Sequence, residues 1–94
     1  SESGLIIAVA TVDTGSGEIV SGPYLVSRGF VYVKDNSAIM NDATAVVEKS
    51  LKKCKDDGIR DFSSMKNKVR ADLKAYIYSK TKRNPMILPI FMEI

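Results

Sequence analysis

The sequence predicts an α+β domain in which a three-stranded β-sheet carries two α-helices packed on one face, in the order β-β-α-α-β. β-branched and aromatic residues are frequent in residues 5–33, and residues 86–93 form a second, almost wholly apolar extended segment. Between these regions, apolar residues recur at the spacing of three and four that is typical of amphipathic helices. Glycine and proline separate the segments. With 94 residues, we expect residues 1–94 to form a single domain.

The strand-like segments alternate with turn residues. Thr14 to Gly17 contains two glycines, which can adopt the positive φ that a hairpin connection needs. Gly22-Pro23 interrupts the second extended region, and Pro89 lies inside the last one. Because proline has no N–H to donate, each indicates a bulge or a sheet edge. The expected extended segments are Leu5 to Asp13, Glu18 to Ser21, Tyr24 to Val33 and Met86 to Glu93.

Two helices are expected in the middle of the chain. The first begins at an N-cap, Asn36 or Ser37, and runs to about Lys55. Gly58 follows and can take the left-handed conformation that ends a helix. The apolar stripe of this helix is Ile39, Met40, Ala43, Val46, Val47, Leu51 and Cys54.

The second helix starts near Asp61 or Ser63 and must stop before Pro85, since the residue preceding proline is pushed out of helical geometry. Its expected buried stripe is Met65, Val69, Leu73, Tyr76 and Ile77.

The expected strands are apolar on both sides. In the last strand, Met86, Leu88, Ile90 and Met92 point one way, and Ile87, Pro89 and Phe91 point the other way. Two helices can cover only one face of the sheet. We therefore expect the second face to meet another surface, in a homodimer or in a larger parent chain. In the alternative, the segment from Gly22 to Val33 folds across that face. The candidate interface residues are Ile6, Ala8, Ala10, Ile87 and Phe91.

The composition argues against most catalytic sites. The chain has no histidine and a single cysteine, which excludes Ser-His-Asp and Cys-His centres and the usual zinc sites. Cys54 falls on an apolar helix face, as expected of a small buried hydrophobe. No spacing places two carboxylates on one face of an element. We therefore predict no catalytic residue, no metal site and no cofactor, and do not expect the isolated chain to be an enzyme.

One motif could suggest catalysis. Asp13-Thr14-Gly15 matches the motif that carries the catalytic carboxylate of an aspartic protease. A half-size chain could supply one such group per subunit of a dimer. A protease half is almost wholly β, however, whereas this chain has a helical centre. The same letters also spell the hairpin turn, which is the favoured interpretation.

Positive charge is concentrated near the end of the second helix. Residues 66–83 contain seven basic residues and one acidic residue, against a net charge of +3 for the whole chain. Lys66, Arg70 and Lys74 are spaced by four, with Tyr78 next in the row, and therefore share one side of the helix. Lys80, Lys82 and Arg83 follow. A phosphate-binding ridge and an ordinary solvated face both remain possible interpretations.

A second basic feature interrupts an apolar segment. In Ser27-Arg28-Gly29-Phe30, the glycine suggests a bulge or the close approach of another backbone. The arginine suits a planar partner such as a carboxylate or a phosphate. A buried structural ion pair is the favoured interpretation. No apolar run approaches the length of a membrane span, and a lone cysteine fits a reducing compartment, so we expect a cytoplasmic protein without a membrane partner.

Two long blocks carry a resemblance to a known family. GPYLVSRGFVYVKD (22–35) and KTKRNPMILPIFMEI (80–94), together with LIIAVATVD, resemble the C-terminal domain of ribonuclease J, a nuclease of the metallo-β-lactamase and β-CASP group. Tyr24 stands where an acidic residue is expected, and Asn84 stands where a second arginine is expected. The resemblance covers essentially the whole chain.

The resemblance implies a role in RNA processing and decay. The family cleaves RNA in a 5′ to 3′ exonucleolytic or an endonucleolytic mode, with zinc held in a lactamase domain that this chain lacks. It implies a non-catalytic accessory domain whose partners are its own catalytic domains or a second copy. RNA contact through Lys66, Arg70, Lys74, Lys80, Lys82 and Arg83 is a secondary possibility. The alternatives are a free-standing RNA-binding module and, as a minor one, the dimeric aspartic protease half.

Overall fold

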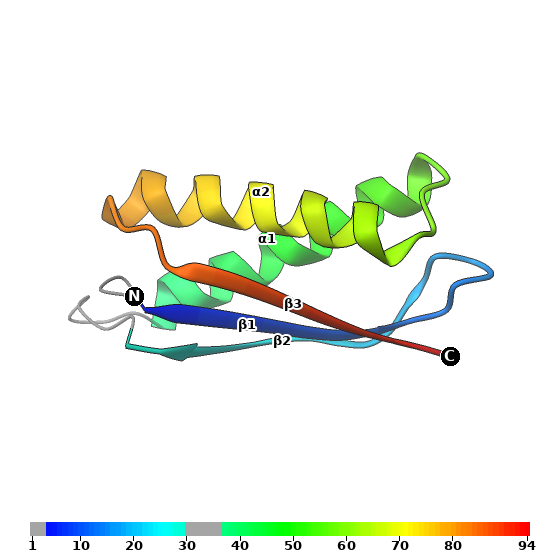
Figure 1. Ribbon diagram of the computed structural model, residues 1–94, viewed down its shortest axis with the longest axis horizontal. Coiled ribbons are helices and arrows are strands. Elements are labelled where there is room, and N and C mark those ends of the chain that lie inside the picture. Colours follow the sequence, from blue (N-terminus) through cyan, green and yellow to red (C-terminus); the bar gives the residue numbers. More distant parts are fainter. Residues whose placement is uncertain (1–3, 30–36) are drawn as a thin grey trace.

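The sheet and both helices form as the sequence predicts. The computed structural model describes residues 4–29 and 37–94. The elements in chain order are β1 (Leu5–Val12), β2 (Ile19–Arg28), α1 (Ser37–Asp56), α2 (Phe62–Thr81) and β3 (Met86–Glu93). Figure 1 shows both helices on the same side of the sheet. This arrangement confirms the predicted α+β class and its β-β-α-α-β order.

The strands are arranged in the order β2-β1-β3, so that the first strand of the chain lies in the centre. β1 pairs with β2 in antiparallel orientation and with β3 in parallel orientation. Pro23 and Pro89 therefore lie on edge strands, as predicted. The pairing of β1 with β2 shifts register between Val9 and Thr11, so the irregularity predicted around Gly22-Pro23 is also present.

The second strand differs from its prediction in extent. It is one continuous strand from Ile19 to Arg28 and not two segments separated at Gly22-Pro23, because the register shift absorbs the interruption without ending the pairing. The predicted extension toward Val33 includes residues 30–33, which lie outside the described residues.

The turn between β1 and β2 is held by the side chain of Asp13. Its Oδ1 accepts hydrogen bonds from the backbone N–H groups of Gly15, at 2.9 Å, and Ser16, at 3.2 Å. Only Gly17 of the two glycines uses a positive φ, of 83°. The Asp13 carboxylate thus organises its own turn, as Asx residues commonly do, and this geometry supports the turn interpretation over the protease motif.

The helix ends agree with the sequence-based expectations. Gly58 adopts a φ of 74° just after α1. Asp61 is the N-cap of α2, and its carboxylate accepts a hydrogen bond of 2.9 Å from the Ser64 N–H. Hydrogen bonds from Ser64 lower the pKa of this carboxyl. Asn36, the alternative cap of α1, lies outside the described residues.

One core lies between the sheet and the two helices. β1 contributes its even-numbered residues to it, and β3 contributes Ile87 and Phe91. The Phe62 and Phe91 rings meet edge to face at 5.7 Å between centroids, which ties the start of α2 to the end of β3. The buried core residues are Ile6, Ala8, Ala10, Val12, Ala43, Val47, Leu51, Cys54, Met65, Val69, Leu73, Ile77, Ile87 and Phe91. None of the described helices is both long and apolar enough for a bilayer crossing.

Candidate interaction surfaces

The side of the sheet that faces away from the helices is apolar. Tyr24, Met86 and Met92 are between 50% and 63% exposed there, and Val26, Leu88 and Ile90 are between 40% and 43% exposed. We call this surface the open face. Its side chains are Leu5, Ile7 and Val9 from β1, Tyr24, Val26 and Arg28 from β2, and Met86, Leu88, Ile90 and Met92 from β3. At the end opposite Arg28, Met92 lies in a row with the polar residues Thr11 and Ser21.

The strand register brings these side chains into rows across the three strands. Arg28, Leu5 and Met86 form the first row. The two rows behind it consist of Val26, Ile7 and Leu88, and of Tyr24, Val9 and Ile90. Because paired residues of adjacent strands project to the same side, the three strands form one continuous apolar surface.

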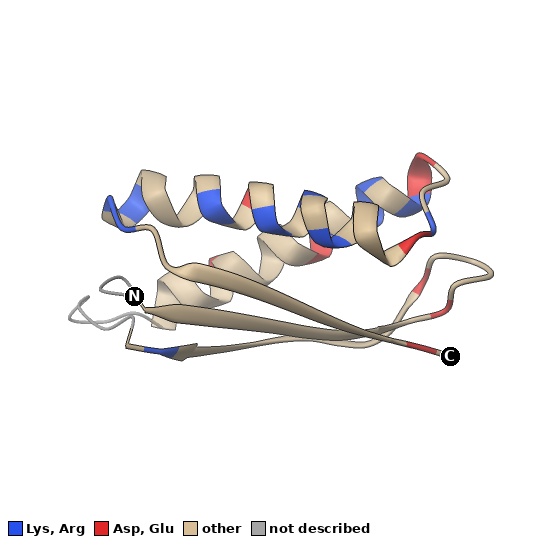
Figure 2. Ribbon diagram, viewed as in Figure 1, with Lys and Arg blue, Asp and Glu red and all other residues tan. Residues whose placement is uncertain are grey.

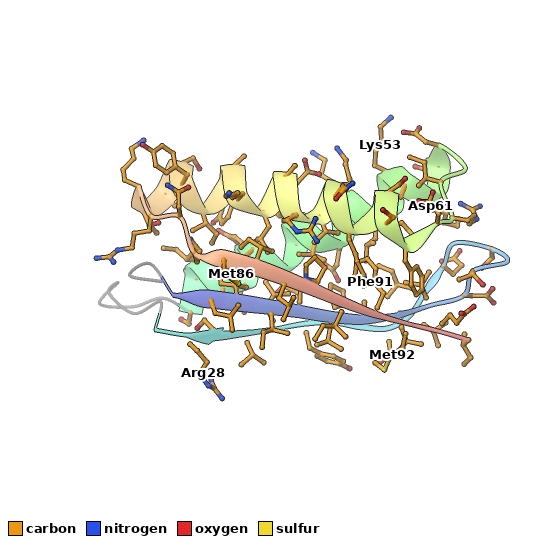
Figure 3. All side chains as sticks on the ribbon, in the orientation of Figure 1. Arg28, Lys53, Asp61, Met86, Phe91 and Met92 are labelled. Carbon is orange, nitrogen blue, oxygen red and sulfur yellow. The ribbon has the colours of Figure 1, made fainter. Side chains whose placement is uncertain are left out.

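Figure 3 shows the two sides of the sheet directly. Arg28 and Met92 project away from the helices, whereas Phe91 points toward α2. No aspartate, glutamate or lysine belongs to the open face. Tyrosine, methionine and arginine are enriched in the cores of protein interfaces, whereas lysine and acidic residues are depleted there. The composition of the open face is therefore that of an interface and not of a solvated surface.

The candidate interface residues named from the sequence lie on the other side of the sheet, so that assignment is wrong. Ile6 and Ala8 are fully buried, Ala10 is 1% exposed, and Ile87 and Phe91 are 5% and 8% exposed, all in the core beneath the helices. Alternation along a strand separates the two faces, but it does not say which of them the helices cover. The available clue was the small size of Ala8 and Ala10 on the covered side of the central strand, while α1 packs over β2 and α2 packs over β3.

The chain's own second strand does not cover the open face. Residues Gly22 to Arg28 form the part of β2 that lies beside β1 at the edge of the sheet. The shielding alternative is therefore wrong for this described part of the segment, since a strand in the plane of the sheet cannot also lie across it.

Arg28 is exposed at one corner of the open face. The favoured interpretation, a buried structural ion pair, is wrong about the burial, since the side chain is exposed. Its guanidinium donates a hydrogen bond of 3.0 Å to the Ser27 carbonyl and has no carboxylate partner among the described residues. Gly29 follows with a φ of 70°, and a Cβ there would lie 3.5 Å from the Gly4 Cα, which agrees with the predicted backbone approach. Phe30 lies outside the described residues.

The helices place the predicted cations on one flank of α2. The buried stripe of α2 is Met65, Val69, Leu73 and Ile77. The residue just before each member of this stripe faces α1. Asp72, for example, accepts a hydrogen bond from Ser50 of α1, and Tyr76 donates one to Asp42 of α1. Positions one residue after the stripe lie on the opposite flank. They are Lys66, Arg70, Lys74 and Tyr78, and Lys82 continues the same spacing at the C-cap. We call these five residues the basic row.

The basic row differs in its ion pairing from four other lysines of the described residues. Lys52, Lys53 and Lys68 form salt bridges of 3.0 to 3.2 Å with acidic residues four positions later, and Lys55 pairs with Glu18 at 3.2 Å. Within residues 4–29 and 37–94, no cation of the basic row has a carboxylate within 4.0 Å. Figure 2 shows positive segments recurring along α2 to its C-terminal end.

Two tyrosines accompany the cations at the end of α2. The Lys82 ammonium lies 5.1 Å from the centroid of the Tyr78 ring, and the Lys80 ammonium lies 5.9 Å from that of Tyr76. Tyr78 is 46% exposed. Of the six predicted RNA-contact residues, the structure thus gathers Lys66, Arg70, Lys74 and Lys82 on one flank, with Lys80 and Arg83 near its end.

A polar contact between the helices was not predicted. Ser50 is 2% exposed, and its hydroxyl lies 2.7 Å from Asp72 Oδ2 and 2.9 Å from the Val46 carbonyl, so that one proton can serve either acceptor. Cys54 lies one turn further along α1, where burial raises the pKa of its thiol. Its burial agrees with the predicted role as a small hydrophobe. The described residues contain no group of three or more side chains suited to hold a metal ion.

These features define a class of module: one sheet, helices on a single side, and an apolar sheet surface left open. Comparison with known proteins identifies the family. The profile of the Ribonuclease J C-terminal domain matches residues 1–94, and the chain belongs to this family.

Named relatives give the same result. The chain is 37% identical over 94 residues to Ribonuclease J2 of Bacillus subtilis. The aligned region covers 100% of the chain and 17% of that protein. The chain is 36% identical over 93 residues to Ribonuclease J 2 of Staphylococcus saprophyticus, covering 99% of the chain and 17% of that protein. The chain thus spans about one sixth of the length of these relatives.

Proposed function

We propose that this domain is an assembly element of a ribonuclease and that the open face is its contact surface. The carrying observation is the set of large apolar side chains exposed on both edge strands, in rows that are completed by half-buried apolar residues of the central strand. An isolated two-layer domain normally presents polar residues on the sheet face that meets water. The occupant that we expect is another part of the parent ribonuclease or a second copy of this chain.

The edges of the sheet are poorly suited to the same task. Met86 donates its N–H to the Gly4 carbonyl at 2.8 Å, and Ile94 donates to the Val12 carbonyl at 3.1 Å. Since N–H groups alternate between the two sides of a strand, Pro89 occupies a position whose N–H would point to the free edge. The same alternation places Pro23 outward on β2. A proline at the free edge discourages the addition of a further strand, which favours contact through the face.

The size of the open face indicates what kind of contact it can make. Three strands about 4.8 Å apart and about eight residues rising about 3.3 Å each give a footprint of roughly 380 Å². A standard interface needs roughly 800 Å² from each partner. We therefore expect weak association of the isolated chain and a stable contact where a covalent connection raises the effective concentration of the partner surface.

Sedimentation across concentration tests this proposal, with Ile90→Lys as the variant and Ala45→Lys as its control. Ala45 is exposed on α1, so the control adds the same charge away from the open face. We expect self-association, or strong binding of an apolar dye by a monomer, and we expect Ile90→Lys but not Ala45→Lys to reduce it. A monomer that binds no dye, or a response that is equal in both variants, would contradict the assembly role.

Catalysis and location form the remaining part of the proposal. We infer that RNA cleavage and its zinc ions belong to other domains of the parent ribonuclease and that this chain supplies no catalytic residue. A cytoplasmic location is supported by the family and by the lone buried thiol of Cys54. RNA contact through the predicted cations is a second candidate function, favoured by the missing carboxylate partners of the basic row.

A further inference from the structure

We infer that the basic row is a docking track for single-stranded RNA and that Tyr78 supplies a stacking platform within it. This inference deepens the second candidate function above and is independent of the open face. Its starting point is the contrast in pairing. Four of the five lysines on α1 and on the inner flank of α2 pair with carboxylates, for example Lys53 with Asp57 and Lys68 with Asp72. The cations on the outer flank do not.

The geometry of the track follows from that of the helix. Residues four apart along α2 are separated by about 6 Å, so that the row from Lys66 to Lys82 extends over about 24 Å. α2 packs over β3, and the Phe62–Phe91 contact shows that the two elements run in opposite directions. α1 occupies the other flank of α2. The basic row therefore lies on the β3 side of the molecule, parallel to the sheet edge and free of other described elements.

A single file of cations suits one phosphate backbone better than two. Proteins that bind single strands combine a positively charged track with aromatic side chains on which bases stack. Tyr78 is the one aromatic residue in the row, and nearly half of its surface is exposed. Lys82 lies over one face of its ring at 5.1 Å, so a base stacked on the opposite face would have a cation close by. A duplex would present two backbones to a surface that offers one row.

Lys66 and Arg70 have features expected of anchored cations. Both are partly buried on the described surface, whereas Lys74 and Lys82 are exposed. A partly buried stem restricts the side chain, so less conformational entropy is lost when the charged group meets a phosphate. Arg70 is held further by a hydrogen bond of 2.8 Å to the Asn67 side chain. The Arg70 guanidinium retains N–H groups for a bidentate phosphate contact.

The test is fluorescence anisotropy with a labelled 12-nucleotide oligouridylate, titrated with this chain at several salt concentrations. The row variant combines Lys66→Gln, Arg70→Gln and Lys74→Gln. Its matched control combines Lys49→Gln, Lys52→Gln and Lys53→Gln, which removes the same charge from α1. At about 0.7 counterions per phosphate contact on a single strand, the row variant should lower the slope of log affinity against log salt by about 2. The control should leave it within error.

Two further measurements separate the track from general attraction to a basic protein. Tyr78→Ala should weaken binding roughly fivefold or more with an unchanged salt slope, as expected for a lost stacking contact, and Tyr24→Ala on the open face should have no effect. A duplex of the same length should bind more weakly than the single strand. Circular dichroism confirms that each variant is folded.

Several results would overturn the track. They are no binding at low salt, equal effects of the two triple variants, an unaffected Tyr78→Ala, or duplex binding as tight as single-strand binding. Equal effects of the triple variants would leave RNA contact as a diffuse property of the domain while removing the track. The assembly proposal is judged separately by sedimentation, which none of the row substitutions should alter.

Discussion

Two isoleucines of β3 provide a direct test of which sheet face is covered. Ile87 is 5% exposed beneath the helices, whereas Ile90 is 42% exposed on the open face. Each is replaced by threonine, which preserves β-branching and therefore the strand preference of the backbone. The two variants thus make the same chemical change on the same strand and differ in the face that receives it.

The expected magnitudes follow from burial. At Ile87, loss of the apolar volume costs about 0.5–1.5 kcal/mol, and a buried hydroxyl without a partner costs about 1–3 kcal/mol more. The combined loss of about 2–4 kcal/mol should lower the melting temperature by roughly 10–30 °C in a chain of this size. At Ile90, water can hydrate the hydroxyl, and the expected loss is below about 1 kcal/mol.

Urea unfolding monitored by circular dichroism measures both losses. Each variant is examined at two protein concentrations, because any association through the open face stabilises the folded state in a concentration-dependent way. The expected result is a much lower urea midpoint for Ile87→Thr than for Ile90→Thr at the lower concentration. Similar midpoints, or a larger loss at Ile90, would refute the assignment of the covered face.

Three further predictions concern single positions. Gly22→Ala should destabilise the fold by more than Gly58→Ala. At Gly58, about 1–2 kcal/mol is expected from the positive φ alone, because a Cβ there would meet nothing within 4 Å, whereas a Cβ at Gly22 would lie 2.7 Å from the Val9 carbonyl oxygen. Equal urea midpoints of the two variants would contradict this prediction. Asp61 has a lowered pKa at its helix cap, so its stabilising contribution is present above about pH 4 and is lost as pH falls through the lowered value. Asp61→Asn should keep the cap and flatten that part of the acid loss in urea midpoints measured from pH 6 to pH 2, and an unchanged profile would argue against it. Burial raises the pKa of the Cys54 thiol, so iodoacetamide at pH 8 should modify it slowly in the native chain and rapidly in urea; equal rates would show that the thiol is accessible.

The sequence was sufficient for the secondary structure because the relevant information is local. Helical periodicity, the Asp61 cap, the Gly58 terminus and the turn at Asp13 each depend on residues only a few positions apart. The edge positions of Pro23 and Pro89 were also predictable, since a missing N–H excludes the middle of a sheet. The same local pattern showed that the strands are apolar on both sides.

The candidate surfaces were only partly predictable. Lys66, Arg70 and Lys74 are four residues apart, which predicted that they lie on one side of a helix. Their position on one side of α2 confirms this. Their lack of carboxylate partners could not be foreseen, because ion pairing across elements depends on how the helices pack. The exposure of Arg28 could not be foreseen for the same reason, since the burial of a side chain depends on how distant parts of the chain pack. Ser50 was missed because its acceptor, Asp72, lies 22 positions away.

The sequence by itself determined the two helices and three strands of the described residues, and it showed that the sheet has more apolar surface than two helices can cover. Those conclusions follow from composition and from periods of 2 and 3.6 residues, which each segment carries within itself. Only the tertiary structure decided which face the helices occupy. That choice depends on packing between segments far apart in the chain, namely α1 over β2 and α2 over β3. As a result, the residues predicted to form the interface are buried beneath the helices, and the side of β3 that carries Met86 and Met92 is exposed.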